Sequence, residues 1–97
     1  MSSPLTLIAT ITALPGHAQA LEAGLRQLVP PSQAEAGCLQ YNLHRHQDQP
    51  NRFIMVEQWL DTAALSAHQQ TAHFKHFVDT CGSLLEPVDH QLMHRIL

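Results

Sequence analysis

Apolar and polar residues alternate near the start of the chain, which is the pattern of a β-strand. Within Leu5–Leu14 every second residue from Leu5 is apolar up to position 13, and threonines, which favour strands, lie among the residues between them. We expect a strand here, ended by Pro15–Gly16. In His17–Val29 the leucines recur at the spacing of one helix face, which predicts a helix. The pair Pro30–Pro31 is expected to end or kink that helix.

Two further alternating segments predict a β-hairpin. They are Cys38–Gln47 and Arg52–Leu60, and the residues between them, DQPN, are typical of a turn. Strict alternation places Leu39 and Tyr41 on one face of the first strand. The second strand is apolar on both faces, which predicts a central strand that is covered on both sides. The stretch before the hairpin, SQAEAG, ends at Gly37 and is expected to be a turn.

The second half of the chain is predicted to contain two helices and a last strand. Asp61 is a suitable N-cap for a helix over Thr62–Gln70, and Thr71 can cap a second helix over Ala72–Glu86 in the same way. In the longer segment, apolar residues recur at helical spacing. A proline then ends the helix, and Val88–Leu97 is predicted to be a strand.

The predicted order of elements is βαββαβ. Short connections and right-handed crossovers fold this order into an α+β, ferredoxin-like antiparallel sheet with helices on one face. We expect a single domain over residues 1–97. Because the strands are apolar on both faces while the helices cover only one, a second copy of the chain is the simplest cover for the other face.

Composition and charge limit the classes of partner molecule that we expect. Only 13% of the 97 residues are charged, and the five Lys and Arg residues are scattered, so nucleic acid is not an expected partner. No apolar run is long enough for a membrane span, and the first residues lack the pattern of a signal peptide. We therefore expect a cytoplasmic protein with no membrane partner. Cys38 and Cys81 match no metal-binding spacing and are expected to be buried thiols.

One combination of residues carries a family resemblance. A strand ending in Glu-x-Trp is followed by an Asp cap, an Ala-Leu pair, a His and a later His-Phe pair. These residues are Glu57, Trp59, Asp61, Ala64, Leu65, His68, His73 and Phe74. A Gly-Cys-Leu-x-Tyr segment, Gly37–Tyr41, precedes them. Together they resemble the antibiotic biosynthesis monooxygenase (ABM) family, and the resemblance extends over nearly the whole chain.

The resemblance implies a homodimeric α+β barrel, in which two sheets pack face to face and each copy has a pocket between sheet and helices. The superfamily includes cofactor-independent monooxygenases, and our hypothesis is an enzyme of this kind that oxidises a small electron-rich aromatic, quinol-like or anthrone-like, with O2. Two alternatives stay open, since the same superfamily contains an isomerase and members without a known reaction. They are a cofactor-free isomerase of a small hydroxyketone and a non-catalytic dimeric protein that binds a small molecule.

The candidate site residues follow from faces and from the resemblance. His68 lies three residues after Leu65 on one helix face, so it is expected to point inward and to act as a base, with Glu57 orienting it. A buried neutral histidine with a structural hydrogen bond is an equally good interpretation. The expected substrate-binding residues are Tyr41, Trp59, His73 and Phe74.

No metal or cofactor is expected from the sequence. His44 and His46 share a strand face, with side chains rooted about 7 Å apart, but no third ligand can be named. The chain has no dinucleotide-binding fingerprint. In the proposed oxygenation the substrate itself is the reductant, so the reaction needs no bound redox group.

Overall fold

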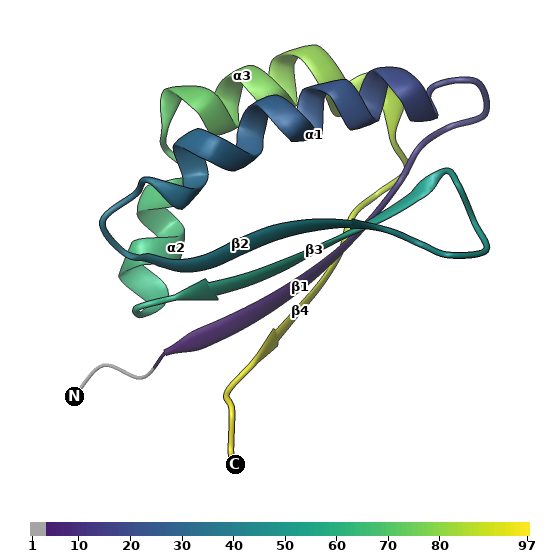
Figure 1. Ribbon diagram of the computed structural model, residues 1–97. Helices are drawn as coiled ribbons and strands as arrows, with labels where there is room; N and C mark the ends of the chain where they lie inside the picture. The colour runs from purple at the N-terminus through teal and green to yellow at the C-terminus, as the bar shows by residue number, and fades with distance from the viewer. Residues whose placement is uncertain (1–3) are drawn as a thin grey trace.

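Four antiparallel strands form one sheet with the helices on one face (Figure 1). The computed structural model describes residues 4–97. Its elements are β1 (Leu5–Thr12), α1 (Ala18–Gln33), β2 (Cys38–Arg45), β3 (Arg52–Trp59), α2 (Thr62–His68), α3 (Ala72–Cys81), a 3-10 turn (Gly82–Leu84) and β4 (Asp89–Met93). The strand order across the sheet is β2-β3-β1-β4. This confirms the α+β, ferredoxin-like prediction, with β1 and β3 as the central strands.

The core lies between the inner face of the sheet and the helices. Figure 1 shows α1 and α3 side by side above the sheet and α2 beyond the ends of β2 and β3. Alternation in the central strands places one side chain in two on this face. The largest fully buried core side chains are Trp59, Phe53, Leu21, Leu25, Met55 and His68. A polar imidazole among these apolar groups marks the part of the core with a role besides packing.

Helix α1 continues through Pro30 and Pro31 to Gln33, so of the two predicted effects, an end or a kink, these prolines do not end the helix. Their missing N–H groups remove donors from the carbonyls four residues earlier, but those residues are exposed and water can replace the bonds. The ladder resumes where the Ala34 N–H donates to the Pro30 carbonyl at 3.2 Å. Ser32, in the extra turn, is buried. The loop to β2 therefore starts later, and closer to the core, than the sequence suggested.

Strand β2 contains a bulge that strict alternation did not predict. Cys38 pairs with Trp59 and Gln40 with Gln58, so Leu39 is an extra residue between two ladder positions. Leu39 is 54% exposed, while Cys38 packs against the core. The bulge shifts the alternation by one residue, so the prediction that Leu39 shares the inner face with Tyr41 was wrong.

The C-terminal elements are shorter than predicted. Helix α3 ends at Cys81 instead of Glu86, because a 3-10 turn follows. Strand β4 pairs with β1 only between Thr10↔Asp89 and Thr6↔Met93. Residues after Met93 have no strand partner in the described structure, and Ile96 and Leu97 are fully exposed. The predicted strand Val88–Leu97 is therefore limited to Asp89–Met93.

The outer face of the sheet carries no helix (Figure 1). Residues of β1 and β3 that point to it include Ile8, Ile54 and Val56, which are only half-buried in the single chain. Met93, at the edge of this face, is 42% exposed. The face is therefore partly apolar, as the alternation of β1 and β3 predicted.

Gly37 provides a test of how α2 is seated on the sheet. A Cβ added at Gly37 lies 2.4 Å from the Cβ of Ala64, and the Gly37 carbonyl is fixed by a hydrogen bond from the Leu60 N–H at 2.9 Å. Replacing Gly by Ala at a tolerant site stabilises by about 0.4–1 kcal/mol. Here we expect Gly37→Ala to lower the free energy of unfolding by about 1–3 kcal/mol, because neither backbone can move freely.

Urea unfolding at fixed protein concentration measures this effect, and Ala64→Gly is the matched partner. In the double variant the cost of Gly37→Ala is expected to disappear, since the opposing methyl group is gone. An equal cost with and without Ala64 contradicts the contact as its cause.

Candidate active site

A cavity of about 260 Å³ lies between the inner sheet face and helices α1 and α3. Its wall is mostly apolar and comes from residues of β1, α1, β2, β3, α3 and the segment up to β4. Three titratable side chains also line it: Tyr41, Glu57 and His90. An apolar cavity with a few converging polar groups is the usual form of a small-molecule site.

A larger hollow of about 630 Å³ lies elsewhere, between Leu39, Gln58 and the C-terminal residues. Half of its lining comes from residues 94–97, which extend beyond β4. Among the described residues that line it, none has a carboxylate side chain, and the ionisable side chains are His94 and Arg95. The inner cavity is therefore the better candidate for chemistry.

Glu57 is the acidic group of the inner cavity. It lies on β3, is 4% exposed, and its Oε1 accepts a hydrogen bond from Trp59 Nε1 at 2.9 Å. Burial raises the pKa of Glu57 to about 7, against a smaller lowering by the Trp59 hydrogen bond. At neutral pH this carboxyl group is close to half-ionised, so it can either accept or donate a proton.

Tyr41 faces Glu57 across the strand pair. The two residues are partners in the register of β2 and β3, and both line the cavity. Burial, and then the nearby Glu57 charge, raise the pKa of the Tyr41 phenol far above its usual value. Tyr41 therefore stays protonated, with Ser32 as a hydrogen-bonding neighbour of its phenol and Glu57 as a charged one.

His68 packs behind this wall. It is 2% exposed, and its ring centroid lies 4.6 Å from that of Trp59, 5.0 Å from Phe74 and 5.3 Å from Tyr41. Its Nδ1 lies 2.6 Å from Glu35 Oε2. Burial lowers the pKa of His68, and the Glu35 hydrogen bond opposes this in part. The ring is therefore a neutral imidazole at pH 7.

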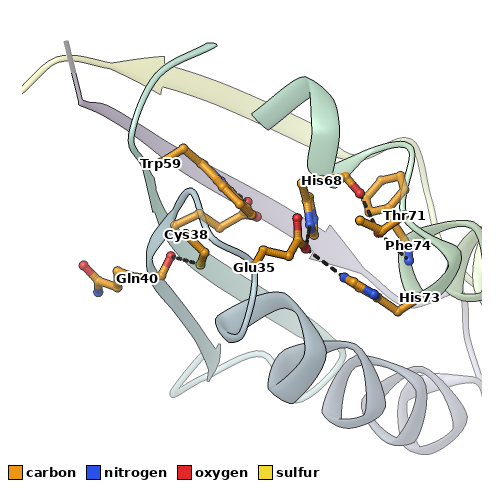
Figure 2. Close-up of polar contacts among 9 residues, drawn as sticks. Glu35, Cys38, Gln40, Trp59, His68, Thr71, His73 and Phe74 are labelled. Atoms are coloured by element: carbon orange, nitrogen blue, oxygen red, sulfur yellow. Dashed lines mark hydrogen bonds and ion pairs between the residues drawn. The ribbon is translucent and has the colours of Figure 1, made fainter. Parts of the chain in front are cut away.

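Glu35 joins two histidines. Figure 2 shows its side chain reaching from the loop between α1 and β2 toward His68 and His73. The same oxygen that contacts His68 lies 2.7 Å from His73 Nε2. A carboxylate oxygen accepts hydrogen bonds, so the geometry is consistent with Nδ1–H of His68 and Nε2–H of His73 as the two donors. We call Glu35, His68 and His73 the carboxylate–imidazole cluster.

Two helix caps set the positions of the histidines. Asp61 Oδ1 accepts from the Ala64 N–H at 2.8 Å and starts α2, which ends at His68. Thr71 Oγ1 accepts from the Phe74 N–H at 3.2 Å and starts α3, and it donates to the His68 carbonyl at 2.7 Å. Thr71 therefore fixes both the end of one helix and the start of the next (Figure 2).

The family model for antibiotic biosynthesis monooxygenases matches residues 4–80, which is most of the chain. The chain belongs to the ABM family. A candidate monooxygenase of Bacillus subtilis, YcnE, is 37% identical over 86 residues, covering 88% of this chain and 90% of the relative. YgiN of Escherichia coli, named a probable quinol monooxygenase, is 34% identical over 93 residues, covering 84% and 89%.

A solved structure shares the fold of this chain. The crystal structure of PA3566 from Pseudomonas aeruginosa matches with a TM-score of 0.95 and 56% identity, over 100% of this chain and 98% of that one. No helix within residues 4–97 is both long and apolar enough to cross a membrane.

Within this ABM domain the predicted pairing of Glu57 with His68 was wrong. Side chains two apart on a strand share a face, so Glu57 reaches the indole of Trp59, while the ring of Trp59 packs on His68. Of the predicted site residues, Tyr41, Glu57 and Phe74 line the cavity. Trp59, His68 and His73 are not among the described residues that line the cavity. Their rings pack against one another behind its wall.

His46, which was considered above as a possible metal ligand, has a structural role. His46 Nδ1 accepts hydrogen bonds from the backbone N–H groups of Asp48 and Gln49 at 3.1 and 3.2 Å, so this ring caps the hairpin turn.

The third member of the carboxylate–imidazole cluster, Glu35, was missed because it lies in the segment that the sequence analysis interpreted as a turn. The available signal was a carboxylate shortly before the Gly37–Tyr41 motif and a buried histidine that needs a partner.

The raised pKa of Glu57 predicts a pH-dependent stability. The folded-state pKa of about 7 exceeds the ordinary value of 4.5, so the folded state binds the proton more tightly. Ionisation of Glu57 therefore destabilises the fold as pH rises, by on the order of 3 kcal/mol once pH exceeds 7. Glu57→Gln keeps an acceptor for Trp59 and removes this penalty.

We expect Glu57→Gln to be more stable than the wild type at pH 8 by on the order of 2–3 kcal/mol, relative to any difference at pH 4. Urea unfolding at both pH values, with equal protein concentrations, measures it. Asp79→Asn, which changes an exposed carboxylate of α3, is the control and is expected to show no such trend. A pH-independent effect of Glu57→Gln contradicts the buried ionisation.

Proposed function

We propose that this chain is a cofactor-independent monooxygenase that oxidises a small quinol-like aromatic with O2. The observation that carries the proposal is Glu57, a carboxyl group with a pKa of about 7 in the wall of an apolar cavity. A general base works best when its pKa lies near the working pH. The relatedness to YgiN supports a quinol as the substrate class.

The proposed reaction begins with proton transfer from a quinol hydroxyl group to the Glu57 carboxylate. The anion that forms is a better electron donor than the neutral quinol, and it passes one electron to O2. The two radicals combine at a ring carbon, and the peroxide takes up the proton and loses water. One oxygen atom remains in a hydroxyquinone and the other leaves as water, so the substrate supplies all the electrons.

Tyr41 and the apolar wall support this sequence of steps. A phenol that stays protonated can donate a hydrogen bond to the developing anion, which favours charge formation in a dry cavity. The buried His68 holds Tyr41, Trp59 and Phe74 in place from behind, which makes it a positioning residue in this proposal. The proton acceptor is therefore assigned to Glu57 instead of His68.

The cavity volume favours a single-ring substrate. An apolar protein cavity of roughly 150 Å³ accommodates benzene. The 260 Å³ of this cavity leave room for one substituted ring and O2. Of the two substrate types implied by the family resemblance, the quinol fits.

A second copy of the chain belongs to the same proposal. The outer sheet face exposes apolar side chains from the two central strands, Ile8, Ile54 and Val56, and apolar faces of this kind are usually covered. An isologous contact between two such faces buries them with no additional partner. A homodimer through the sheet faces is thus the expected state.

The first prediction from this proposal concerns O2 uptake. Metal-stripped protein is expected to consume O2 with single-ring reduced quinones, after correction for autoxidation at each pH. The enzyme-dependent rate should rise with pH through about 7, because ionised Glu57 is the base. Glu57→Gln should lower kcat by about 100-fold or more, the usual scale for loss of a general base.

Asp79→Asn, on the exposed side of α3, is the control and should keep the wild-type rate and pH profile. Full activity in Glu57→Gln contradicts the assignment of the base. No uptake with any quinol rejects the monooxygenase. In that case, product formation from a hydroxyketone without O2 identifies an isomerase, and binding without turnover identifies a binding protein.

The second prediction concerns the dimer. Val56→Lys places a charge in the middle of the outer sheet face and is expected to convert a dimer into a folded monomer, as measured by light scattering and circular dichroism. Gln27→Lys, on the exposed face of α1, should remain dimeric. A wild type that is monomeric at micromolar concentration, or a Val56→Lys variant that stays dimeric, rejects this interface.

A further inference from the structure

The carboxylate–imidazole cluster has the composition of a metal site. One ligand atom from each of Glu35, His68 and His73 lies within 4.8 Å of the other two. The three residues come from different elements: the loop after α1, the end of α2 and the first turn of α3. Two neutral imidazoles and one carboxylate are the donor set of many three-ligand zinc sites. The proton transfer proposed for Glu57 gives this cluster no direct task.

We propose that Glu35, His68 and His73 form a binding site for a divalent late transition-metal ion, with Zn²⁺ as the preferred occupant. Two nitrogen ligands in three exclude Mg²⁺ and Ca²⁺, which take oxygen ligands. Among first-row ions, this mixed set favours Zn²⁺ and its neighbours Ni²⁺ and Cu²⁺. With three protein ligands, a tetrahedral ion keeps one position for water or another small ligand.

Coordination requires the three ligand atoms, which now lie within 4.8 Å of one another, to adopt the spacing of a tetrahedral ion. Bonds of about 2.0–2.1 Å in a tetrahedron place ligand atoms about 3.3 Å apart. The Glu35 oxygen now lies 2.6 and 2.7 Å from the two nitrogens, so it must withdraw by several tenths of an ångström. Glu35 can do so because it lies in the loop before β2, outside the helices and strands. The histidines keep their capped helices.

The cluster is also accessible from one side. The side chains of His73 and Glu35 are 24% and 15% exposed, whereas His68 is 2% exposed. An ion can therefore enter past His73 and meet His68 as its innermost ligand. The surrounding aromatic rings of Trp59 and Phe74 restrict the His68 ring to one orientation.

Binding moves hydrogens without changing their number. In the metal-free cluster, Nδ1 of His68 and Nε2 of His73 carry the hydrogens that Glu35 accepts. A metal ion needs the lone pair at the same nitrogen atoms. Each ring must then carry its hydrogen on the opposite nitrogen. The tautomer change is a signature that only direct coordination produces.

The first experiment is calorimetric titration of untagged, metal-stripped protein with ZnCl₂ at pH 7. One ion per chain is expected. Glu35→Gln and His73→Gln should each weaken binding at least about 10-fold, the scale reached even when an outer partner of a metal ligand is lost. His76→Gln, one helical turn after His73 and exposed, and His44→Gln are the matched controls and should bind as the wild type.

The second experiment reads the histidines directly. Long-range ¹H–¹⁵N spectra of the wild type should show His68 as the Nδ1–H tautomer without metal. With one equivalent of Zn²⁺, His68 should appear as the Nε2–H tautomer and His73 as the Nδ1–H tautomer. This readout does not require that any variant folds. Unchanged affinity in both cluster variants, or Zn²⁺ shifts confined to other histidines, overturns the site.

The metal proposal can be tested separately from the monooxygenase activity. Its readouts are affinity and tautomeric state, so failure of the O2 uptake experiment leaves it intact. In the same way, absence of Zn²⁺ binding leaves the assignment of Glu57 as the base untouched.

Discussion

Two ionisable side chains, Glu57 and His68, lie in the apolar layer between sheet and helices. Each has a different hydrogen-bond partner that stabilises it there. An unpaired charge in such surroundings costs several kcal/mol, so a buried group must be neutralised or bonded. Glu57 accepts the Trp59 indole hydrogen and has a pKa of about 7. His68 stays neutral and bonds to Glu35. One arrangement places a proton acceptor in a cavity, and the other places a polar cluster behind its wall.

The position of Glu35 depends on features that are far from it in the fold. Helix α1 has to pass two prolines and run to Gln33 before the loop can turn back toward α2. Gly37 then lets the loop pass close beneath Ala64, at a distance that no larger residue allows. The bulge at Leu39 follows at once and turns Cys38 into the core. The carboxylate–imidazole cluster thus depends on the loop between α1 and β2, which packs closely against α2.

The features that the sequence predicted correctly are those that a local pattern of residues controls. Alternation in β1 and β3, the leucine spacing of α1 and the caps Asp61 and Thr71 are each encoded within a few residues, and all appear in the structure. The partner of His68 depends on a contact across 33 residues, which no local pattern specifies. The bulge was missed for a related reason, since one extra residue leaves composition and period almost unchanged.

The two sites are physically coupled through Trp59. Its indole donates to Glu57, and its ring packs on His68, which in turn bonds to Glu35. Burial is the main cause of the raised pKa of Glu57, and the charge of Glu35 adds a smaller rise. A cation held by Glu35 would offset that contribution and lower the pKa of Glu57. Occupancy of the proposed metal site would therefore favour the ionised form of Glu57. A metal ion bound there would act on the proposed base without touching the substrate.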